Sequence, residues 1–258
     1  MNNVNLKAIT ENLLDTFLEA GKIAREICEK GVKITIKPDK SPVTDGDLIV
    51  DKILTDKIKN LTPDVLVVSE ETVNLKIQNK EKNFWLIDPI DGTRDYINKR
   101  DEYTLNAALI LNLEPAIGII YAPAKDRLFF SYGKNLAYEI SDKKTTHLNC
   151  KKKNIEKVIG LENSRDTPSE IFKIYKKHNV SETLKMSSSL KFCILAAGEA
   201  DIYAAQARAF EWDVAAGHAI LSHAGGIMTT HDEKKIFYGK KNYRNTSIIA
   251  KRRINLKK

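Results

Sequence analysis

Two carboxylates and one hydroxyl lie within six residues of each other in the segment 84–97, FWLIDPIDGTRDYI. Asp88 follows the apolar run FWLI, whose length and composition indicate a buried strand that stops at this residue. Asp91 comes next in an Asp-Gly turn, followed by Thr93. Close carboxylates raise each other's pKa unless a cation lies between them, and Mg²⁺ prefers such oxygen ligands, often together with a phosphate. The segment predicts either a magnesium site or an Asp-rich turn with a capping role for Asp88.

A second predicted strand also ends in carboxylates. The apolar run VLVV at 65–68 is followed by Ser-Glu-Glu, which includes Glu70. Ligands of open sheets gather beyond the carboxyl ends of the strands, so we expect Glu70, Asp88 and Asp91 to face one site.

Two further acidic residues, Asp47 and Asp213, could either take part in the site or cap the start of a helix. Thr44 is a suitable N-cap for a helix predicted over 45–60, in which Asp47 takes the acidic position of a capping box. Asp213 precedes a helix predicted over 214–224, and it would serve there as the cap. The local sequence alone favours the capping role for both residues.

The serines at 187–189 precede a helix predicted over 190–198. Three hydroxyls there suit an N-cap, and the free N–H groups of a helix start also suit an anion site. His218 and His223 are five apart, whereas two ligands on one helical face need a spacing of three or four. We therefore interpret both histidines as packing or surface residues.

The remaining pattern predicts a mixed α/β protein. It indicates an amphipathic helix over 5–30, a half-buried strand over 32–37, and closely connected strands that form an antiparallel meander. These strands are expected at 103–111, 116–121, 127–132 and 136–140, and the second half adds strands at 158–161, 200–204 and 247–250 and a helix at 168–177. The lysine-rich stretch 142–157 is interpreted as a surface junction. We expect a single catalytic unit, 1–258, with an N-terminal α+β lobe (about 1–145) and a C-terminal α/β lobe (about 146–258).

Composition and the absence of targeting patterns indicate a globular, cytoplasmic protein with a positively charged surface. The net charge is +8, but the lysines are scattered, so a solvated surface is favoured over nucleic-acid binding, and it would attract a polyanionic substrate. No apolar run approaches the roughly 18 residues of a membrane span, and the N-terminus lacks a signal pattern. Cys28, Cys150 and Cys193 are widely spaced, which predicts inert thiols rather than disulfides or a zinc site. The oligomeric state is not predictable from the sequence.

Four motifs together resemble the magnesium-dependent, lithium-sensitive phosphatase superfamily, which includes inositol monophosphatases, fructose-1,6-bisphosphatases and bisphosphate nucleotidases. The motifs are SPVTDGD (41–47), SEE (69–71), WLIDPIDGT (85–93) and WD (212–213). Three others, YAP (121–123), SSLKFC (188–193) and DVAAGH (213–218), most resemble the CysQ branch. The resemblance implies a layered αβαβα sandwich, inhibition by lithium, and removal of the 3′-phosphate from adenosine 3′,5′-bisphosphate.

The same resemblance assigns a role to each candidate residue and implies two or three Mg²⁺ ions per active site. Glu70, Asp88 and the Ile90 carbonyl match the ligands of one ion, and Asp88, Asp91 and Asp213 match those of a second. Asp47 and Thr93 match the pair that orients and deprotonates the attacking water, in a catalytic group that also includes Glu70. The residues that match substrate contacts are Asp91, Gly92, Thr93, Ser188, Lys191 and Asp213.

One departure concerns the substrate. CysQ-like proteins usually carry an arginine two residues after the tyrosine before the tryptophan-aspartate motif, and here Tyr203 is followed by Ala204 and Ala205. Arg208 on the same loop is a candidate substitute, and Glu211 is also unusual for the branch. An inositol or sugar phosphate phosphatase is therefore the alternative within enzymes. A non-catalytic ligand-sensing or RNA-polymerase-associated module is the alternative outside them.

Overall fold

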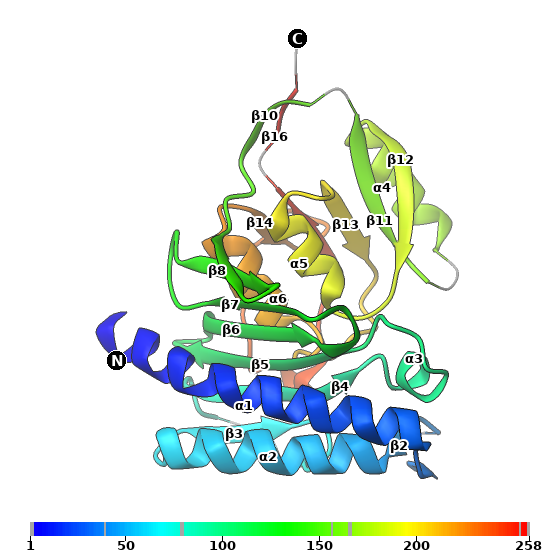
Figure 1. Ribbon diagram of the computed structural model, residues 1–258. Coiled ribbons are helices and arrows are strands. Elements are labelled where there is room, and N and C mark those ends of the chain that lie inside the picture. Colours follow the sequence, from blue (N-terminus) through cyan, green and yellow to red (C-terminus); the bar gives the residue numbers. More distant parts are fainter. Residues whose placement is uncertain are drawn as a thin grey trace.

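The chain forms five layers, seen edge-on in Figure 1. This computed structural model describes residues 3–38, 40–77, 80–155, 157–164, 167–252 and 254–256, with side chains except at 3–4, 152–155 and 254–256. Helices α1 (Asn3–Lys30) and α2 (Asp45–Leu61) cover one face of a seven-stranded sheet. Helices α5 (Leu190–Ala197) and α6 (Ala215–His223) separate it from a five-stranded sheet, and α4 (Ser169–Lys177) covers the outer face. The predicted αβαβα sandwich is confirmed.

The seven-stranded sheet has its strands in chain order and is antiparallel except at one edge. Its strands are β3 (Leu66–Ser69), β4 (Phe84–Asp91), β5 (Thr104–Leu111), β6 (Glu114–Ala122), β7 (Arg127–Ser131), β8 (Ala137–Ser141) and β9 (Lys144–His147). β3 and β4 are parallel, and every later pair is antiparallel, so the predicted meander is confirmed. The edge strand β9 was not predicted, because its four residues are all exposed and carry no apolar pattern.

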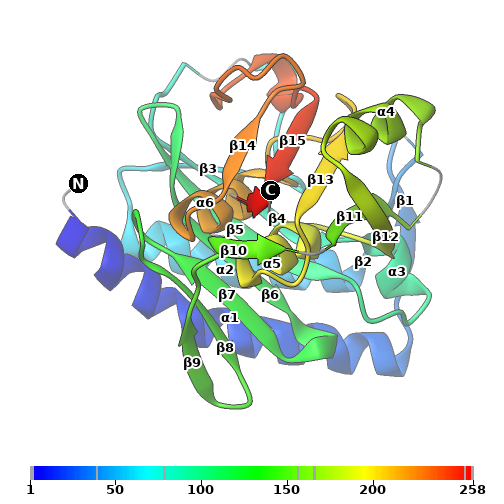
Figure 2. The same ribbon diagram turned by 90° about the horizontal axis from the view of Figure 1, so that it is seen from above.

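The five-stranded sheet places its strands in the order β12 (Val180–Met186), β11 (Val158–Asn163), β13 (Ile202–Ala205), β15 (Ile248–Lys251) and β14 (Ile227–Thr229). β12, β11 and β13 are parallel, whereas β15 runs antiparallel to both of its neighbours. Figure 2 shows the strands in this order, from β12 on the right to β14 on the left. The small elements are the pairs β1 (Ile34–Ile36) with β2 (Pro42–Thr44) and β10 (Lys152–Ile155) with β16 (Ile254–Leu256), together with α3 (Thr93–Ile97), η1 (Pro123–Lys125) and η2 (Lys241–Tyr243).

Two sequence-based expectations about strands were wrong. The strand at 32–37 is not half-buried, since all three residues of β1 are exposed. The strand before Asp88 does not stop there, because β4 continues to Asp91, with a register irregularity against β5 between these two residues. The residues after Asp88 lack the apolar pattern of the first half of β4. The sequence pattern therefore ends at the register irregularity, three residues before the end of the strand.

Strand β4 is buried on both faces, which explains its continuous apolar run. Phe84 and Leu86 pack in the core beneath α5 and α6, and Trp85 and Ile87 pack in the core beneath α1 and α2. The indole N–H of Trp85 donates to Thr62 Oγ1 at 3.0 Å. Both acidic strand ends are thereby fixed between two packed layers.

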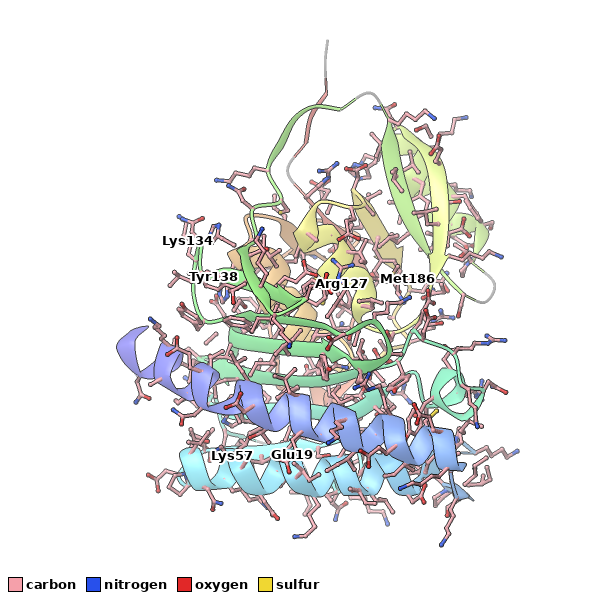
Figure 3. All side chains as sticks on the ribbon, in the orientation of Figure 1. Glu19, Lys57, Arg127, Lys134, Tyr138 and Met186 are labelled. Atoms are coloured by element: carbon pink, nitrogen blue, oxygen red, sulfur yellow. The ribbon has the colours of Figure 1, made fainter. Side chains whose placement is uncertain are left out.

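An ion pair connects the seven-stranded sheet to the end of α5. Arg127 on β7, labelled in Figure 3, donates to Glu139 on β8 at 2.5 Å and to Glu199, which follows α5. The three cysteines are buried, and no disulfide joins any two of them. Of the described helices, none combines the length and apolar character that crossing a bilayer requires. The division into two lobes near residue 145 stays a prediction.

Candidate active site

Three carboxylates from three elements converge at the carboxyl ends of β3 and β4. Glu70 directly follows β3, and its backbone N–H donates to Ile87 O at 3.1 Å, which holds it beside Asp88. Asp213 comes from the segment before α6. One side-chain oxygen of each residue lies within 4.8 Å of the others, which is the spacing of a shared cation site.

The chemistry of this cluster fits a divalent metal ion. Asp88 is 2% exposed, and its Oδ1 has no hydrogen-bond partner among the described residues. Burial raises the pKa of Asp88 well above its ordinary value, and repulsion from Glu70 and Asp91 raises it further. Burial also raises the pKa of Asp213, and repulsion from Asp91 and Glu70 raises it further. A cation would relieve both effects, and Mg²⁺ accepts ligands of this type.

Asp91 lies beside this cluster and has a second set of contacts. Its Oδ2 accepts a hydrogen bond from the backbone N–H of Ser189 at 2.5 Å. Burial raises the pKa of Asp91 to about 6, and the charge of Lys191 opposes the rise. Asp91 therefore lies close both to the carboxylate cluster and to Lys191.

A polar network behind Asp91 was missed by the sequence reasoning. The Ser189 hydroxyl bonds to Asn106 Oδ1 at 2.7 Å and to Thr104 Oγ1 at 2.8 Å, both on β5. Ser189 thus does not cap α5 with its side chain. Thr104 and Asn106 sit in an otherwise apolar strand, and this is the signal that marks them as buried polar residues with a purpose.

Asp47 serves as a helix cap and also faces the site. Its Oδ2 accepts from the backbone N–H and the hydroxyl of Thr44, at 2.8 and 2.6 Å, and this completes the predicted capping box. Its Oδ1 accepts from Thr93 Oγ1 at 3.4 Å. The same hydroxyl lies 3.2 Å from Ile90 O, so Thr93 connects Asp47 to the carbonyl that the resemblance assigned to a metal.

Lys37 is a further residue that the sequence did not indicate. Its ammonium group donates to Glu70 Oε1 at 3.2 Å and to Glu71 Oε1 at 2.8 Å. Burial raises the pKa of Glu71 to about 7, although Lys37 opposes the rise. A lysine before a proline in a polar loop carries no sequence signal for this contact.

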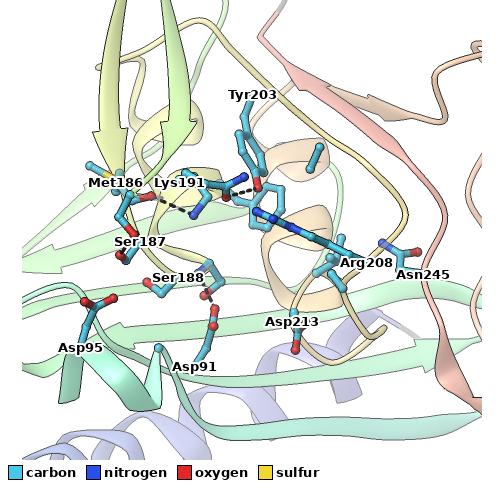
Figure 4. A pocket seen from close by; sticks show the side chains of 18 of the residues that line it. Asp91, Asp95, Met186, Ser187, Ser188, Lys191, Tyr203, Arg208, Asp213 and Asn245 are labelled. Carbon is cyan, nitrogen blue, oxygen red and sulfur yellow. Dashed lines mark hydrogen bonds between the residues drawn. The ribbon is translucent and has the colours of Figure 1, made fainter. Parts of the chain in front are cut away.

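The carboxylates open into a pocket of about 510 Å³ (Figure 4). Its lining includes these residues from the sequence-based set: Glu70, Asp91, Gly92, Thr93, Ser188, Lys191 and Asp213. Asp47, Asp88 and the Ile90 side chain are at most 2% exposed and complete the site from the interior. Asp213 is not the N-cap of α6, since Val214 holds that position. Its Oδ2 instead accepts from the Phe210 N–H at 2.8 Å.

Cationic side chains occupy another part of this pocket. Lys191 is 5% exposed, donates to Met186 O at 3.2 Å, and lies 5.1 Å from the ring centroid of Tyr203. Burial lowers the pKa of Lys191 to about 8, an effect that Asp91 opposes. The Arg208 side chain extends toward Lys191 and Tyr203 in Figure 4, and it too lines the pocket. The pocket therefore has an acidic part and a basic part.

The two departures noted in the sequence have different structural settings. Ala205 lines the pocket with a short side chain, and the cation of this loop is Arg208. Glu211 is fully buried, accepts from the N–H groups of Gly239 and Lys240 at 2.8 and 3.0 Å, and pairs with the Lys240 ammonium at 2.7 Å. Glu211 thus fixes a neighbouring loop.

Fold and site together define a class of phosphatase-like proteins, and comparison with known families agrees. The model of the inositol monophosphatase family matches residues 5–258. The chain belongs to the inositol monophosphatase family.

Within this family the chain is similar to proteins named CysQ. It is 36% identical over 206 residues to the 3′(2′),5′-bisphosphate nucleotidase CysQ of Buchnera aphidicola, a match that covers 78% of this chain and 76% of that protein. The Escherichia coli K12 protein of the same name is 31% identical over 219 residues, with 81% and 84% covered. The crystal structure of CysQ from Bacteroides thetaiotaomicron has a TM-score of 0.76 and 28% identity, with 94% and 96% covered.

Proposed function

We propose that the protein is a magnesium-dependent 3′(2′),5′-bisphosphate nucleotidase, which hydrolyses the 3′-phosphate of adenosine 3′,5′-bisphosphate to give AMP and phosphate. The observation that carries this proposal is the convergence of Glu70, Asp88 and Asp213 at one end of a pocket that also contains Lys191 and Arg208. The similarity to CysQ proteins supports the same substrate.

The carboxylates would hold the metal ions. Glu70, Asp88 and the Ile90 carbonyl are the proposed ligands of one ion, and Asp88, Asp91 and Asp213 those of another. Bound Mg²⁺ supplies positive charge to the phosphate and lowers the pKa of bound water. The buried Asp88 oxygen without a partner among the described residues fits this role.

The residues of the chain itself perform the proton transfer. Thr93 Oγ1, 3.4 Å from Asp47 Oδ1, would accept the proton of the attacking water while it donates its own toward Asp47. Burial raises the pKa of Asp47 above its ordinary value, which makes this carboxylate a better base. Gly92 and Thr93 begin α3, whose first N–H groups have no partner within a helix and would contact the phosphate oxygens.

The basic part of the pocket would bind the second phosphate. Lys191 and Arg208 line it together with Ser188, whose hydroxyl adds a neutral donor. Arginine contacts phosphate through several N–H groups at once, so Arg208 is suited to replace the arginine that the CysQ branch carries at position 205. An inositol monophosphate has a single phosphate and would leave this part unused.

We expect adenosine 3′,5′-bisphosphate to be the preferred substrate over inositol 1-phosphate by at least about 100-fold in kcat/KM, because only the first has groups for both parts of the pocket. Release of inorganic phosphate in the presence of Mg²⁺ measures both reactions. A preference for inositol 1-phosphate would make the protein an inositol monophosphatase, and no hydrolysis of either substrate would support the non-catalytic alternative.

We expect Arg208→Gln to lower kcat/KM for adenosine 3′,5′-bisphosphate about 10- to 100-fold, which is the loss of one charge-assisted phosphate contact. Adenosine 3′-monophosphate is the matched control substrate, because it lacks the 5′-phosphate that Arg208 would bind. For this control substrate, Arg208→Gln should change kcat/KM by less than about threefold, because no charge-assisted contact to it is lost. Equal losses for both substrates would show that Arg208 does not contact the second phosphate.

A further inference from the structure

Asn245 is a buried polar residue that none of the roles above uses. It lies between η2 and β15, is 5% exposed, and lines the pocket. Its side-chain Oδ1 and Nδ2 are both buried, and neither has a hydrogen-bond partner among the described residues. Because buried unpaired polar groups cost folding free energy, an amide with two of them points to a ligand that pairs with both.

The position of this amide is fixed by the backbone. The Asn245 N–H donates to Ala209 O at 2.9 Å, and the neighbouring Arg244 Nη1 donates to Arg208 O at 3.1 Å. These bonds attach the Asn245 segment to the loop that carries Arg208. In Figure 4, Asn245 lies on the side of Arg208 and Asp213, away from Asp95 and Ser187.

Part of the pocket lining is apolar. It includes Ala205 at the end of β13, Ala209 of the Arg208 loop, Val214 before α6, and Ile248, which pairs with Ala205 from the start of β15. Such a surface suits the faces of a flat ring, and the amide suits the polar edge of that ring. The short side chain of Ala205 leaves room where an arginine would fill the space.

The hydrogen-bond chemistry of an amide selects among ligands. Oδ1 requires a donor and Nδ2 an adjacent acceptor, whereas a phosphate offers acceptors alone and would leave Oδ1 facing negative charge. Adenine offers an amino donor beside a ring-nitrogen acceptor, and asparagine is the side chain that pairs with this edge in two hydrogen bonds.

We propose that Asn245 recognises the nucleobase of the substrate, through two hydrogen bonds to the amino group and ring nitrogen of adenine. This inference rests on the proposed nucleotidase function and extends it from the phosphates to the base. Since both amide atoms are covered, a base reaches them when a neighbouring side chain moves, and the adjoining loop offers the long, exposed side chains of Gln206 and Arg208.

The test compares two substrates on two proteins. We expect the wild-type enzyme to hydrolyse adenosine 3′,5′-bisphosphate with a kcat/KM about 5- to 150-fold above that for purine riboside 3′,5′-bisphosphate, which lacks the 6-amino group. Asn245→Leu, which has a similar shape and no polar atoms, should lose this preference and treat both substrates alike. Its Tm should not fall, because two unpaired polar atoms are removed. Asn245→Ala is the second variant, in case leucine does not fit.

Asn12→Leu on the exposed face of α1 is the matched control and should retain the wild-type preference. The inference is overturned if the wild-type enzyme shows no preference for the amino group, or if the Asn245 variants retain it. If the wild-type enzyme hydrolyses neither nucleotide, the proposed function fails instead. If the wild-type enzyme hydrolyses both nucleotides with equal efficiency, base recognition by Asn245 is refuted, and the proposed nucleotidase function is not affected.

Discussion

Asp88→Asn should lower kcat/KM by at least about 1,000-fold, because it removes a charge that both proposed metal ions share. The substitution preserves the shape of the side chain, so the loss would come from the charge. Asp88 is the most buried of the three converging carboxylates, and Glu70 and Asp213 lie within reach of the same cation. Release of phosphate from adenosine 3′,5′-bisphosphate across a Mg²⁺ titration measures the effect.

The same substitution should raise the stability of the protein without metal. The pKa of Asp88 is raised in the folded state, so at neutral pH this carboxyl group costs folding free energy; the cost shrinks as the pH falls below the raised pKa and disappears near the ordinary pKa of an aspartate. Asparagine removes that cost at neutral pH. Wild-type protein should gain stability when Mg²⁺ is added, and Asp88→Asn should gain little. Thermal unfolding with and without Mg²⁺ measures both effects: the higher Tm of Asp88→Asn without metal, and its smaller rise in Tm when Mg²⁺ is added.

Asp56→Asn provides the control for this comparison. Asp56 is an exposed acid on α2 that pairs with Lys52, so its loss should leave both activity and the response to Mg²⁺ unchanged. Near-normal turnover by Asp88→Asn would contradict the two-metal assignment. A lowered Tm in EDTA, together with an undiminished gain from Mg²⁺, would show that Asp88 has a structural role instead.

Local sequence predicted the parts of the site that depend on strand ends and helix starts. The parallel pairing of β3 with β4 brings Glu70 beside Asp88, as the rule for carboxyl ends of strands suggests. Thr44 and Asp47 form the expected capping box. These features were predictable because each depends on residues close together in the chain, or on adjacent strands.

Contacts between distant segments were not predictable in this way. Lys37 reaches Glu70 across the fold, and the Ser189 N–H donates to Asp91, which lies 98 positions earlier. Asn245 belongs to a polar turn with no pattern of its own, and only the pairing of its backbone with Ala209 brings it to the pocket. Strand β12 was missed because its five central residues are exposed, and an exposed edge strand lacks the apolar run that marks a buried one.

Capping and catalysis at Asp47 first appeared as alternatives, and the structure makes them compatible. Oδ2 completes the capping box with Thr44, while Oδ1 faces Thr93. One carboxylate can therefore hold the start of α2 and take part in proton transfer. The cap also fixes the orientation of the oxygen that Thr93 contacts, which is a requirement for a positioned base.

Asp47→Asn should lower kcat about 100- to 10,000-fold and leave the stabilisation by Mg²⁺ largely intact, because a general base is lost and no proposed metal ligand is changed. Thr93→Val should also lower kcat more than it weakens the response to Mg²⁺. If the two residues act as a unit, the double variant should be little slower than Asp47→Asn alone. Single-turnover hydrolysis and thermal unfolding with Mg²⁺ measure the two properties separately.

Thr44→Ala distinguishes proton transfer from capping. Loss of the cap should cost about 0.5–2 kcal/mol of stability, and turnover should stay within about tenfold of the wild type, since Asp47 retains the oxygen that faces Thr93. If Asp47 acts only as a cap, Asp47→Asn and Thr44→Ala should behave alike, with reduced stability and similar turnover. A large loss of kcat in Asp47→Asn but not in Thr44→Ala would show that Asp47 has both roles. Its Oδ1 would then accept the proton from Thr93, and its Oδ2 would cap the start of α2.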